Sequence, residues 1–139
     1  MNCENSILIR APLPAIFAAT SDLEHWPAVL PHYRWVRVLE RNGSSMTVQM
    51  AARRGWLPIH WTSRYEADTG ARELRFHHLK AFTRGMDVKW TFSQTDEGVL
   101  VRISHELPGR WYDRLLAHHF IEPIASRTLA AFKTHLERS

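Results

Sequence analysis

The sequence predicts an α+β fold in which a curved antiparallel β-sheet wraps around a long C-terminal α-helix. From about residue 34 to residue 107, apolar and polar residues alternate with period two, and turn residues interrupt the alternation. After Pro108-Gly109 the apolar residues recur with a helical period instead. The chain has 139 residues, 45% of them hydrophobic, which suits one domain over residues 1–139 with a single core.

The first thirty residues predict one strand followed by two short helices. Residues 5–10 form a short apolar strand, which two prolines in the following segment end. Residues 15–20 then form one or two helical turns, with Ile16 and Phe17 pointing inward. Residues 23–29 form a second short helix, which ends before Pro31.

Six further strands follow from the alternation and from the turns between them. Asn42-Gly43 is a strong hairpin signal. The clearest alternation places Met86, Val88 and Trp90 on one face and the intervening polar residues on the other. One apolar and one solvated face are typical of an antiparallel sheet that covers a core on one side. The predicted strands are 34–40, 46–50, 61–66, 74–78, 86–93 and 99–107.

The C-terminal segment supplies the element that this apolar sheet face needs. Its apolar stripe comprises Leu116, Phe120, Ile124, Leu129, Phe132 and Leu136. Pro123 should kink or split the helix, because proline removes a helical N–H. Since no other large apolar element is available, we expect the sheet to curl around this helix.

This order of elements, together with several local motifs, resembles the START-like or SRPBCC superfamily, whose fold is the helix-grip (START/Bet v 1-like) fold. Within it, the sequence looks like the bacterial polyketide cyclase/aromatase branch. The motifs that carry the resemblance are Ile9-Arg10-Ala11-Pro12 before Ile16-Phe17, Asp22-Leu23-Glu24-His25-Trp26-Pro27, Tyr33, Val38-Leu39-Glu40-Arg41-Asn42-Gly43, Trp61-Thr62-Ser63, and Gly85-Met86 followed by Trp90. The superfamily combines lipid transfer, quinone binding and catalysis on one scaffold, so the fold alone does not select a function.

The resemblance implies a cavity between the sheet and the long helix, under the two short helices. Matching positions line the pocket of the aromatic cyclases, and strand parity independently places Trp61 with Ser63 and Met86 with Trp90. The alternative to a cavity is a core that these side chains fill completely. The expected ligand-binding residues are Trp26, Trp61, Ser63, His78, Met86, Trp90, Phe120 and Ile124.

One position departs from the cyclase pattern. The cyclases carry a pocket arginine two residues after the serine, and here that position is Tyr65. Arg64 is adjacent, but strand alternation sends it to the opposite face. His105 stands where a related cyclase has a polar glutamine. The absence of this arginine favours ligand binding without catalysis, or catalysis on a different substrate.

The polar residues of the inner face suggest a catalytic hypothesis. Cyclising a poly-β-ketone requires an acid that polarises a carbonyl and a base that takes a neighbouring proton. We expect Tyr33 and Tyr65 as hydrogen-bond donors and His105 as the proton shuttle. A structural interpretation stands beside it, because a histidine at a strand end and a tyrosine near a rim often serve packing alone.

Two functions therefore remain open from the sequence. The first is an aromatase/cyclase acting on a polyketide chain, and the second is a non-catalytic carrier of a lipid or isoprenoid quinone. In either case the partner is a hydrophobic small molecule. An acyl carrier protein is a further candidate partner, and both a monomer and a homodimer remain open.

Other classes of function have little support in the sequence. The nine histidines show no His-Glu-x-x-His pattern and the single Cys3 cannot form a zinc site, so we expect no metal and no cofactor. The net charge is +4, but the arginines are interleaved with acids and the aromatics point inward, so we expect no nucleic-acid partner. With no signal peptide in the first ten residues and no apolar run of membrane-spanning length, we expect a cytoplasmic protein with no transmembrane segment.

Overall fold

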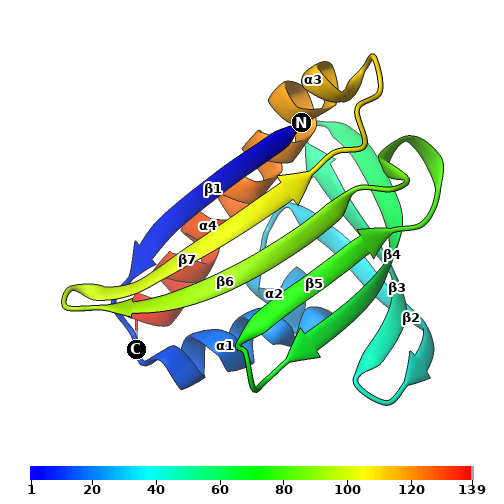
Figure 1. The fold of residues 1–139 in the computed structure, drawn as a ribbon. Helices are drawn as coiled ribbons and strands as arrows, with labels where there is room; N and C mark the ends of the chain where they lie inside the picture. Colours follow the sequence, from blue (N-terminus) through cyan, green and yellow to red (C-terminus); the bar gives the residue numbers. More distant parts are fainter. Residues whose placement is uncertain (139) are drawn as a thin grey trace.

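A computed structural model describes residues 1–138 and contains one seven-stranded antiparallel sheet in the order β1-β7-β6-β5-β4-β3-β2. The sheet curves around the helical C-terminal segment, while α1 and α2 cross one end of the sheet (Figure 1). The strands are β1 (Asn2–Ile9), β2 (Tyr33–Asn42), β3 (Ser45–Arg54), β4 (Leu57–Asp68), β5 (Glu73–His78), β6 (Asp87–Thr95) and β7 (Gly98–Glu106). The helical elements are α1 (Leu13–Ser21), η1 (Leu23–His25), α2 (Trp26–Val29), η2 (Ala81–Thr83), α3 (Asp113–Leu116), η3 (Ala117–Ile121) and α4 (Glu122–Glu137). The predicted fold is thus confirmed.

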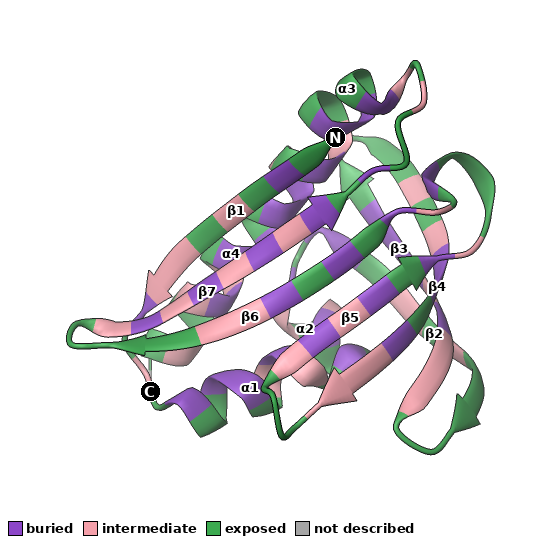
Figure 2. Cartoon of the chain, in the orientation of Figure 1, coloured by how far each residue is buried: buried purple, intermediate pink, exposed green. Residues whose placement is uncertain are grey.

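The period-two alternation of the sequence corresponds to the two faces of the sheet. Buried and more exposed residues alternate along β5, along β7 and from Asp87 to Trp90 of β6 (Figure 2). On β7 the buried members are Val99, Val101, Ile103 and His105. Because these residues point towards α4, the inner face forms the wall of the core.

The N-terminal strand is longer than predicted. Strand β1 begins at Asn2, because Asn2 and Cys3 pair with Glu106 and His105 at the end of β7. The polar start of β1 gave no local sign of a strand. Its conformation depends on pairing with residues more than a hundred positions away.

The second predicted helix is divided in two. A 3₁₀ turn, η1, precedes the single-turn helix α2. Pro27 has no N–H to donate to the carbonyl of Leu23, so a continuous α-helix cannot pass through it. The division places Trp26 at the junction, where its Nε1 donates to the carbonyl of Thr20 at 3.1 Å. This bond fixes the Trp26 ring in the core.

The C-terminal helical segment changes its winding before Pro123, as the sequence indicated. Helix α3 passes into a π-helical turn, η3, and the α-helix resumes as α4 with Pro123 in its first turn. A proline leaves the carbonyl four residues earlier without its usual donor. That carbonyl belongs to His119, and it accepts a hydrogen bond from Arg54 Nε at 2.9 Å.

The opposite end of α4 is attached to β1. Lys133 Nζ donates to the carbonyl of Leu8 at 2.6 Å, and the backbone N–H of Arg10 donates to the Glu137 carboxylate at 2.8 Å. Lys133 and Glu137 also form an ion pair at 2.7 Å. The C-terminal half of the helix is therefore held against the edge of the sheet. Within residues 1–138, no helix is both long and apolar enough to cross a membrane.

Candidate functional site

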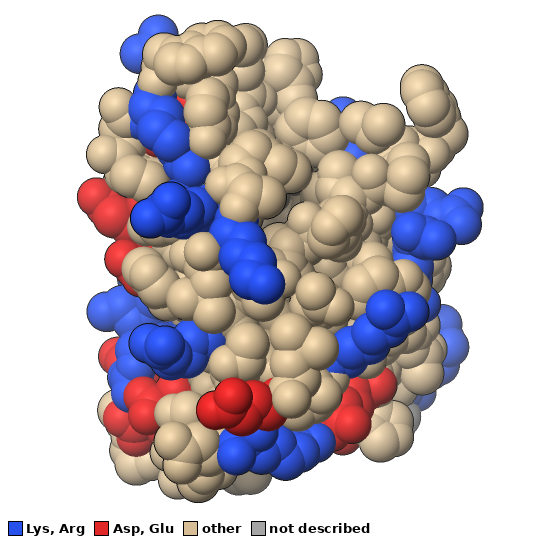
Figure 3. Space-filling model, turned by 90° about the vertical axis from the view of Figure 1, so that its right-hand side faces the viewer, with Lys and Arg blue, Asp and Glu red and all other residues tan. Residues whose placement is uncertain are grey.

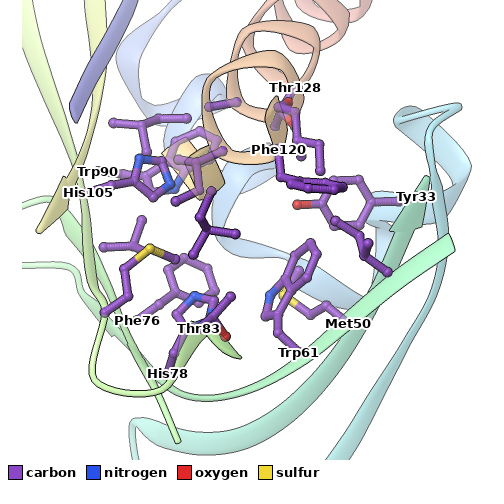
Figure 4. Close-up of a pocket in the computed structure, with 18 of the residues that line it drawn as sticks. Tyr33, Met50, Trp61, Phe76, His78, Thr83, Trp90, His105, Phe120 and Thr128 are labelled. Atoms are coloured by element: carbon purple, nitrogen blue, oxygen red, sulfur yellow. The ribbon is translucent and has the colours of Figure 1, made fainter. Parts of the chain in front are cut away.

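A cavity of about 90 Å³ lies between the inner face of the sheet and the helical segment η3–α4. Side chains from the six strands β2 to β7, the β5–β6 loop and the helices converge on it (Figure 4). Its lining residues are Trp26, Tyr33, Met50, Ile59, Trp61, Phe76, His78, Phe82, Thr83, Met86, Val88, Trp90, Ile103, His105, Leu116, Phe120, Ile121, Ile124, Ala125 and Thr128.

Most of the residues expected at the site line this cavity. Those that do are Trp26, Tyr33, Trp61, His78, Met86, Trp90, His105, Phe120 and Ile124. Ser63 and Tyr65 are not among the lining residues. They share the inner face of β4 with Trp61, but β4 runs away from the cavity, so each step of two residues carries a side chain farther from it.

Tyr65 instead makes a structural contact at the far end of β4. Its hydroxyl donates to the carbonyl of Ser21 at 2.9 Å, which ties the strand to the end of α1. Its ring packs on Phe76, with centroids 4.8 Å apart. Burial raises the pKa of Tyr65, so the phenol keeps its proton. Ser63 is fully buried, and its hydroxyl has no hydrogen-bond partner in the described part of the chain.

His105 is the polar group that β7 presents to the cavity. It is 8% exposed, and within residues 1–138 its Nδ1 has no hydrogen-bond partner. Burial lowers the pKa of His105 to about 4, because an apolar environment disfavours the imidazolium. The ring is therefore neutral at pH 7.

A second buried imidazole, His78, lies across the cavity wall from β5. Its Nδ1 is 2.9 Å from the hydroxyl of Thr83, which fixes the ring orientation. Burial, and to a smaller extent the neighbouring His105, lowers the pKa of His78 to about 3. Trp61 stacks on it at a centroid distance of 6.1 Å. The two histidines thus form a neutral polar strip in an apolar wall.

Tyr33 provides the third polar group, from the start of β2. Figure 4 shows it on the opposite side of the cavity from His105. Burial raises the pKa of Tyr33, and hydrogen bonding with the Thr128 side chain opposes that effect. Thr128 in turn donates to the carbonyl of Ile124 at 2.7 Å and lies 2.8 Å from His32 Nε2. The phenol of Tyr33 therefore stays protonated and lies beside the buried hydroxyl of Thr128.

The apolar wall is a continuous cluster of aromatic rings. Trp26 lies at its centre and makes an edge contact with Tyr33 at 5.2 Å. It also contacts Trp90 at 5.6 Å and Phe132 at 5.7 Å. Offset and edge-to-face contacts of this kind favour defined ring positions. The wall therefore offers a rigid apolar surface against which a flat molecule can pack.

The cavity is small compared with the sites of drug-sized ligands, which occupy roughly 300–1,000 Å³. The less buried lining residues are Ile59, Trp61, Phe82 and Phe120. They belong to β4, η2 and η3, and because they are the more exposed part of the lining we call this side of the cavity its mouth. A ligand larger than a few atoms therefore requires these side chains to move.

Two polar lining residues, Thr83 and Thr128, were missed from the sequence. Thr128 lies four residues after Ile124, so the spacing of the apolar stripe could have indicated it. Thr83 lies in the short helix η2 of the β5–β6 loop, where no periodicity places a side chain. The apolar residues missed are Met50, Ile59, Phe76, Phe82, Val88, Ile103, Leu116, Ile121 and Ala125.

No group of three His, Cys, Asp or Glu side chains comes together as metal ligands in residues 1–138. The polar side chains that line the cavity include two neutral imidazoles, a protonated phenol and threonine hydroxyls. Such groups can donate to a carbonyl oxygen and accept a proton from carbon acids.

A seven-stranded sheet that grips a long helix around an apolar cavity defines the class of START-like, helix-grip proteins. The model of the family described as polyketide cyclase/dehydrase and lipid transport matches residues 9–133, so the chain belongs to this family. A protein named as a polyketide cyclase in Streptomyces halstedii is 33% identical over 105 residues, which cover 71% of this chain and 94% of that protein.

Solved structures agree with this assignment at the level of the fold. The Zhui aromatase/cyclase from Streptomyces sp. R1128 superposes with a TM-score of 0.83 over 99% of this chain and 94% of its own, at 17% identity. The di-domain ARO/CYC BexL from the BE-7585A biosynthetic pathway is 26% identical, with a TM-score of 0.75. That match covers 99% of this chain and 46% of BexL. Cyclase enzymes are therefore among the relatives of this protein.

Proposed function

We propose that the protein binds a polyketide chain in the cavity and catalyses its aldol-type cyclisation and dehydration. The observation that carries the proposal is the His105 imidazole, buried and neutral, with an Nδ1 that no group in residues 1–138 engages. A buried polar atom without a partner is costly unless a ligand or water satisfies it. A carbonyl-rich ligand in the apolar cavity would do so.

The proposed reaction uses the two polar sides of the cavity. His105 takes a proton from a carbon between two carbonyl groups of the substrate, which leaves an enolate. The enolate carbon forms a C–C bond with a second carbonyl, whose oxygen takes up a proton to become a hydroxyl. Loss of that hydroxyl with a neighbouring proton, as water, completes the dehydration.

Tyr33 is proposed to stabilise the negative charge that develops on the carbonyl oxygen. Its raised pKa keeps the phenol protonated, so it can donate a hydrogen bond to that oxygen in place of its hydrogen bond with Thr128. His78, held by Thr83, provides a second neutral hydrogen-bonding group on the His105 side. The sequence hypothesis also gave Tyr65 a donor role, but its hydroxyl already donates to Ser21 outside the cavity, so we do not include it.

The test is to reconstitute the protein with a synthase that makes an unreduced polyketide chain and to analyse the products by mass spectrometry. His105→Gln and Tyr33→Phe should each shift the products towards spontaneously cyclised compounds by about tenfold or more. Tyr65→Phe serves as the matched control, because it removes a phenol oxygen outside the cavity. Unchanged products with both cavity variants would refute a catalytic role.

A second candidate function is the non-catalytic carriage of a lipid or isoprenoid quinone. It is favoured by a lining in which residues 1–138 place no Lys or Arg side chain, while the position of the cyclase arginine holds Tyr65, outside the cavity. Native mass spectrometry of freshly purified protein, followed by extraction, separates the two. A co-purified phospholipid or quinone supports the carrier, and an empty protein that binds flat polyphenols supports the cyclase.

A further inference from the structure

The end of the molecule that carries the cavity mouth exposes an unusual number of large apolar side chains. Three segments form it, residues 53–60, 80–84 and 109–120, and we call their combined exterior the mouth surface. Trp56 is 87% exposed and Trp111 is 88% exposed, whereas most tryptophans in folded domains are largely buried. The other large exposed apolar residues of the mouth surface are Leu57, Phe82 and Leu115.

Hydrogen bonds hold the three segments together around the opening. Arg54 Nε donates to the carbonyl of His119 at 2.9 Å and joins the first segment to the third. The Tyr112 hydroxyl donates to the carbonyl of Phe82 at 2.8 Å and joins the third to the second. The same segments supply Ile59, Phe82 and Phe120 to the cavity lining. The exposed apolar groups therefore surround the path into the cavity.

The exposed charged side chains of the mouth surface are all basic. Its basic residues are Arg53, Arg54, Lys80, Arg84, Arg110 and Arg114. Its single acidic residue, Asp113, is 2% exposed and paired with Arg110 at 3.0 Å. In Figure 3 Lys and Arg side chains flank a hollow on both sides, and the acidic side chains lie at the left edge and lower part of the view. A binding partner for this surface should therefore be anionic.

We propose that the mouth surface docks the protein on a lipid bilayer that contains anionic phospholipid. Tryptophan favours the boundary between headgroups and acyl chains, and basic side chains favour an anionic leaflet. The tryptophans project from two separate segments around an opening, which a deformable bilayer accommodates more readily than the flat, packed face of a protein partner. In this position the cavity opens towards the acyl chains, so an apolar ligand enters without crossing water.

This inference rests on the proposed function only in that the ligand is apolar. Vesicle binding is measured on the protein without any ligand, and ligand binding is measured without vesicles. Failure of one measurement therefore leaves the other interpretable.

The experiment is co-sedimentation of the purified chain with vesicles of phosphatidylcholine alone or with about 30% of the anionic lipid phosphatidylglycerol. The chain should bind the anionic vesicles and bind neutral ones at least about fivefold more weakly. The double variant Trp56→Ser with Trp111→Ser should weaken anionic binding by about tenfold or more, because two apolar anchors are lost.

Matched control variants test the contributions of the basic and of the apolar side chains separately. Lys80→Gln with Arg114→Gln should weaken binding by about fivefold for each charge removed. Arg72→Gln with Lys89→Gln removes the same net charge from exposed positions outside the mouth surface and should have less effect. Leu39→Ser is the corresponding apolar control on β2. Absence of vesicle binding, equal binding by the tryptophan variant, or binding to an acidic carrier protein but not to vesicles would each overturn the proposal.

Discussion

The Nε of Arg54, on the last residue of β3, donates a hydrogen bond to the carbonyl oxygen of His119 in the π-helical turn. Pro123 explains why this carbonyl is available, since proline lacks the N–H that would otherwise bond to it. A side chain of the sheet thus replaces a missing backbone donor of the helix. Phe120 and Ile121, the next two residues, line the cavity, so the contact positions part of the cavity wall.

Arg54→Met should lower the free energy of unfolding by about 1 kcal/mol, because the His119 carbonyl loses its donor. In a Pro123→Ala background the same substitution should cost less, since the alanine N–H can bond to His119. Urea unfolding of the four proteins of this double-mutant cycle measures the coupling. Arg53→Met is the control at the neighbouring exposed arginine, and an equal cost of Arg54→Met in both backgrounds would contradict the explanation.

The stability of the fold should depend steeply on pH between about 6.5 and 4. Burial lowers the pKa of His32 and His105 to about 4 and that of His78 to about 3. Over this range the unfolded chain binds protons that the folded chain excludes, so stability falls as pH falls. Each histidine should contribute about 1.4 kcal/mol per pH unit. Urea unfolding at several pH values checks the slope.

A substitution isolates the contribution of one ring to that slope. His105→Gln should reduce it by about 1.4 kcal/mol per pH unit between pH 6.5 and 5, where carboxyl groups contribute little. His118→Gln, at an exposed position of η3, is the control substitution. If His105→Gln leaves the slope of the wild type, the imidazole is not held neutral by the fold.

Loss of the Tyr65 hydroxyl should affect the stability of the fold and not the binding of a ligand. Tyr65→Phe should lower the free energy of unfolding by about 1 kcal/mol, because the bond to the Ser21 carbonyl is lost. It should leave the affinity for a hydrophobic probe unchanged. Thermal unfolding and dye titration measure the two effects, and a large change in probe affinity with Tyr65→Phe would place its hydroxyl at the site after all.

Phe120→Ala should enlarge the cavity and favour larger ligands. A ligand that buries about 50 Å² more apolar surface gains about 1.3 kcal/mol, which is about tenfold in Kd. Fluorescence titration with a polycyclic aromatic probe measures it. The control Phe132→Ala removes a ring that is fully buried against Trp26 and Trp90 and should cost about 3–5 kcal/mol of stability. Weaker probe binding by Phe120→Ala would show that this ring contacts the ligand rather than obstructing it.

The sequence predicted the architecture because local periodicity and the long-range fold agree. The alternation on β6 and β7 and the four-residue spacing from Leu116 to Ile124 each identified a face that is buried. The start of β1 at Asn2 could not be predicted, since its pairing with Glu106 depends on the assembled sheet. Pro123 indicated a break in the helix, but the π-helical form of that break depends on packing.

The candidate site was predictable to the extent that strand parity determines it. Parity placed Trp61, Trp90 and His105 on the inner face, where they line the cavity. It placed Tyr65 on the same face, but parity gives no distance along the strand, and Tyr65 lies beyond the cavity. Thr83 and the exposed Phe82 belong to a loop, whose course depends on contacts such as the bond from Tyr112. Cavity walls made by loops are therefore the part that periodicity misses.

The attachment of α4 differs between its two ends, and this difference has a consequence for how the family can diversify. Lys133 and Glu137 fasten its C-terminal end to backbone groups at the end of β1 and just beyond it, whereas on its N-terminal side the preceding turn η3 is bonded to β3 by one side chain, that of Arg54. Substitutions near the singly held end can reshape the binding volume while the firmly held end preserves folding. Ligand preference can therefore drift over evolutionary time without a matching loss of thermodynamic robustness.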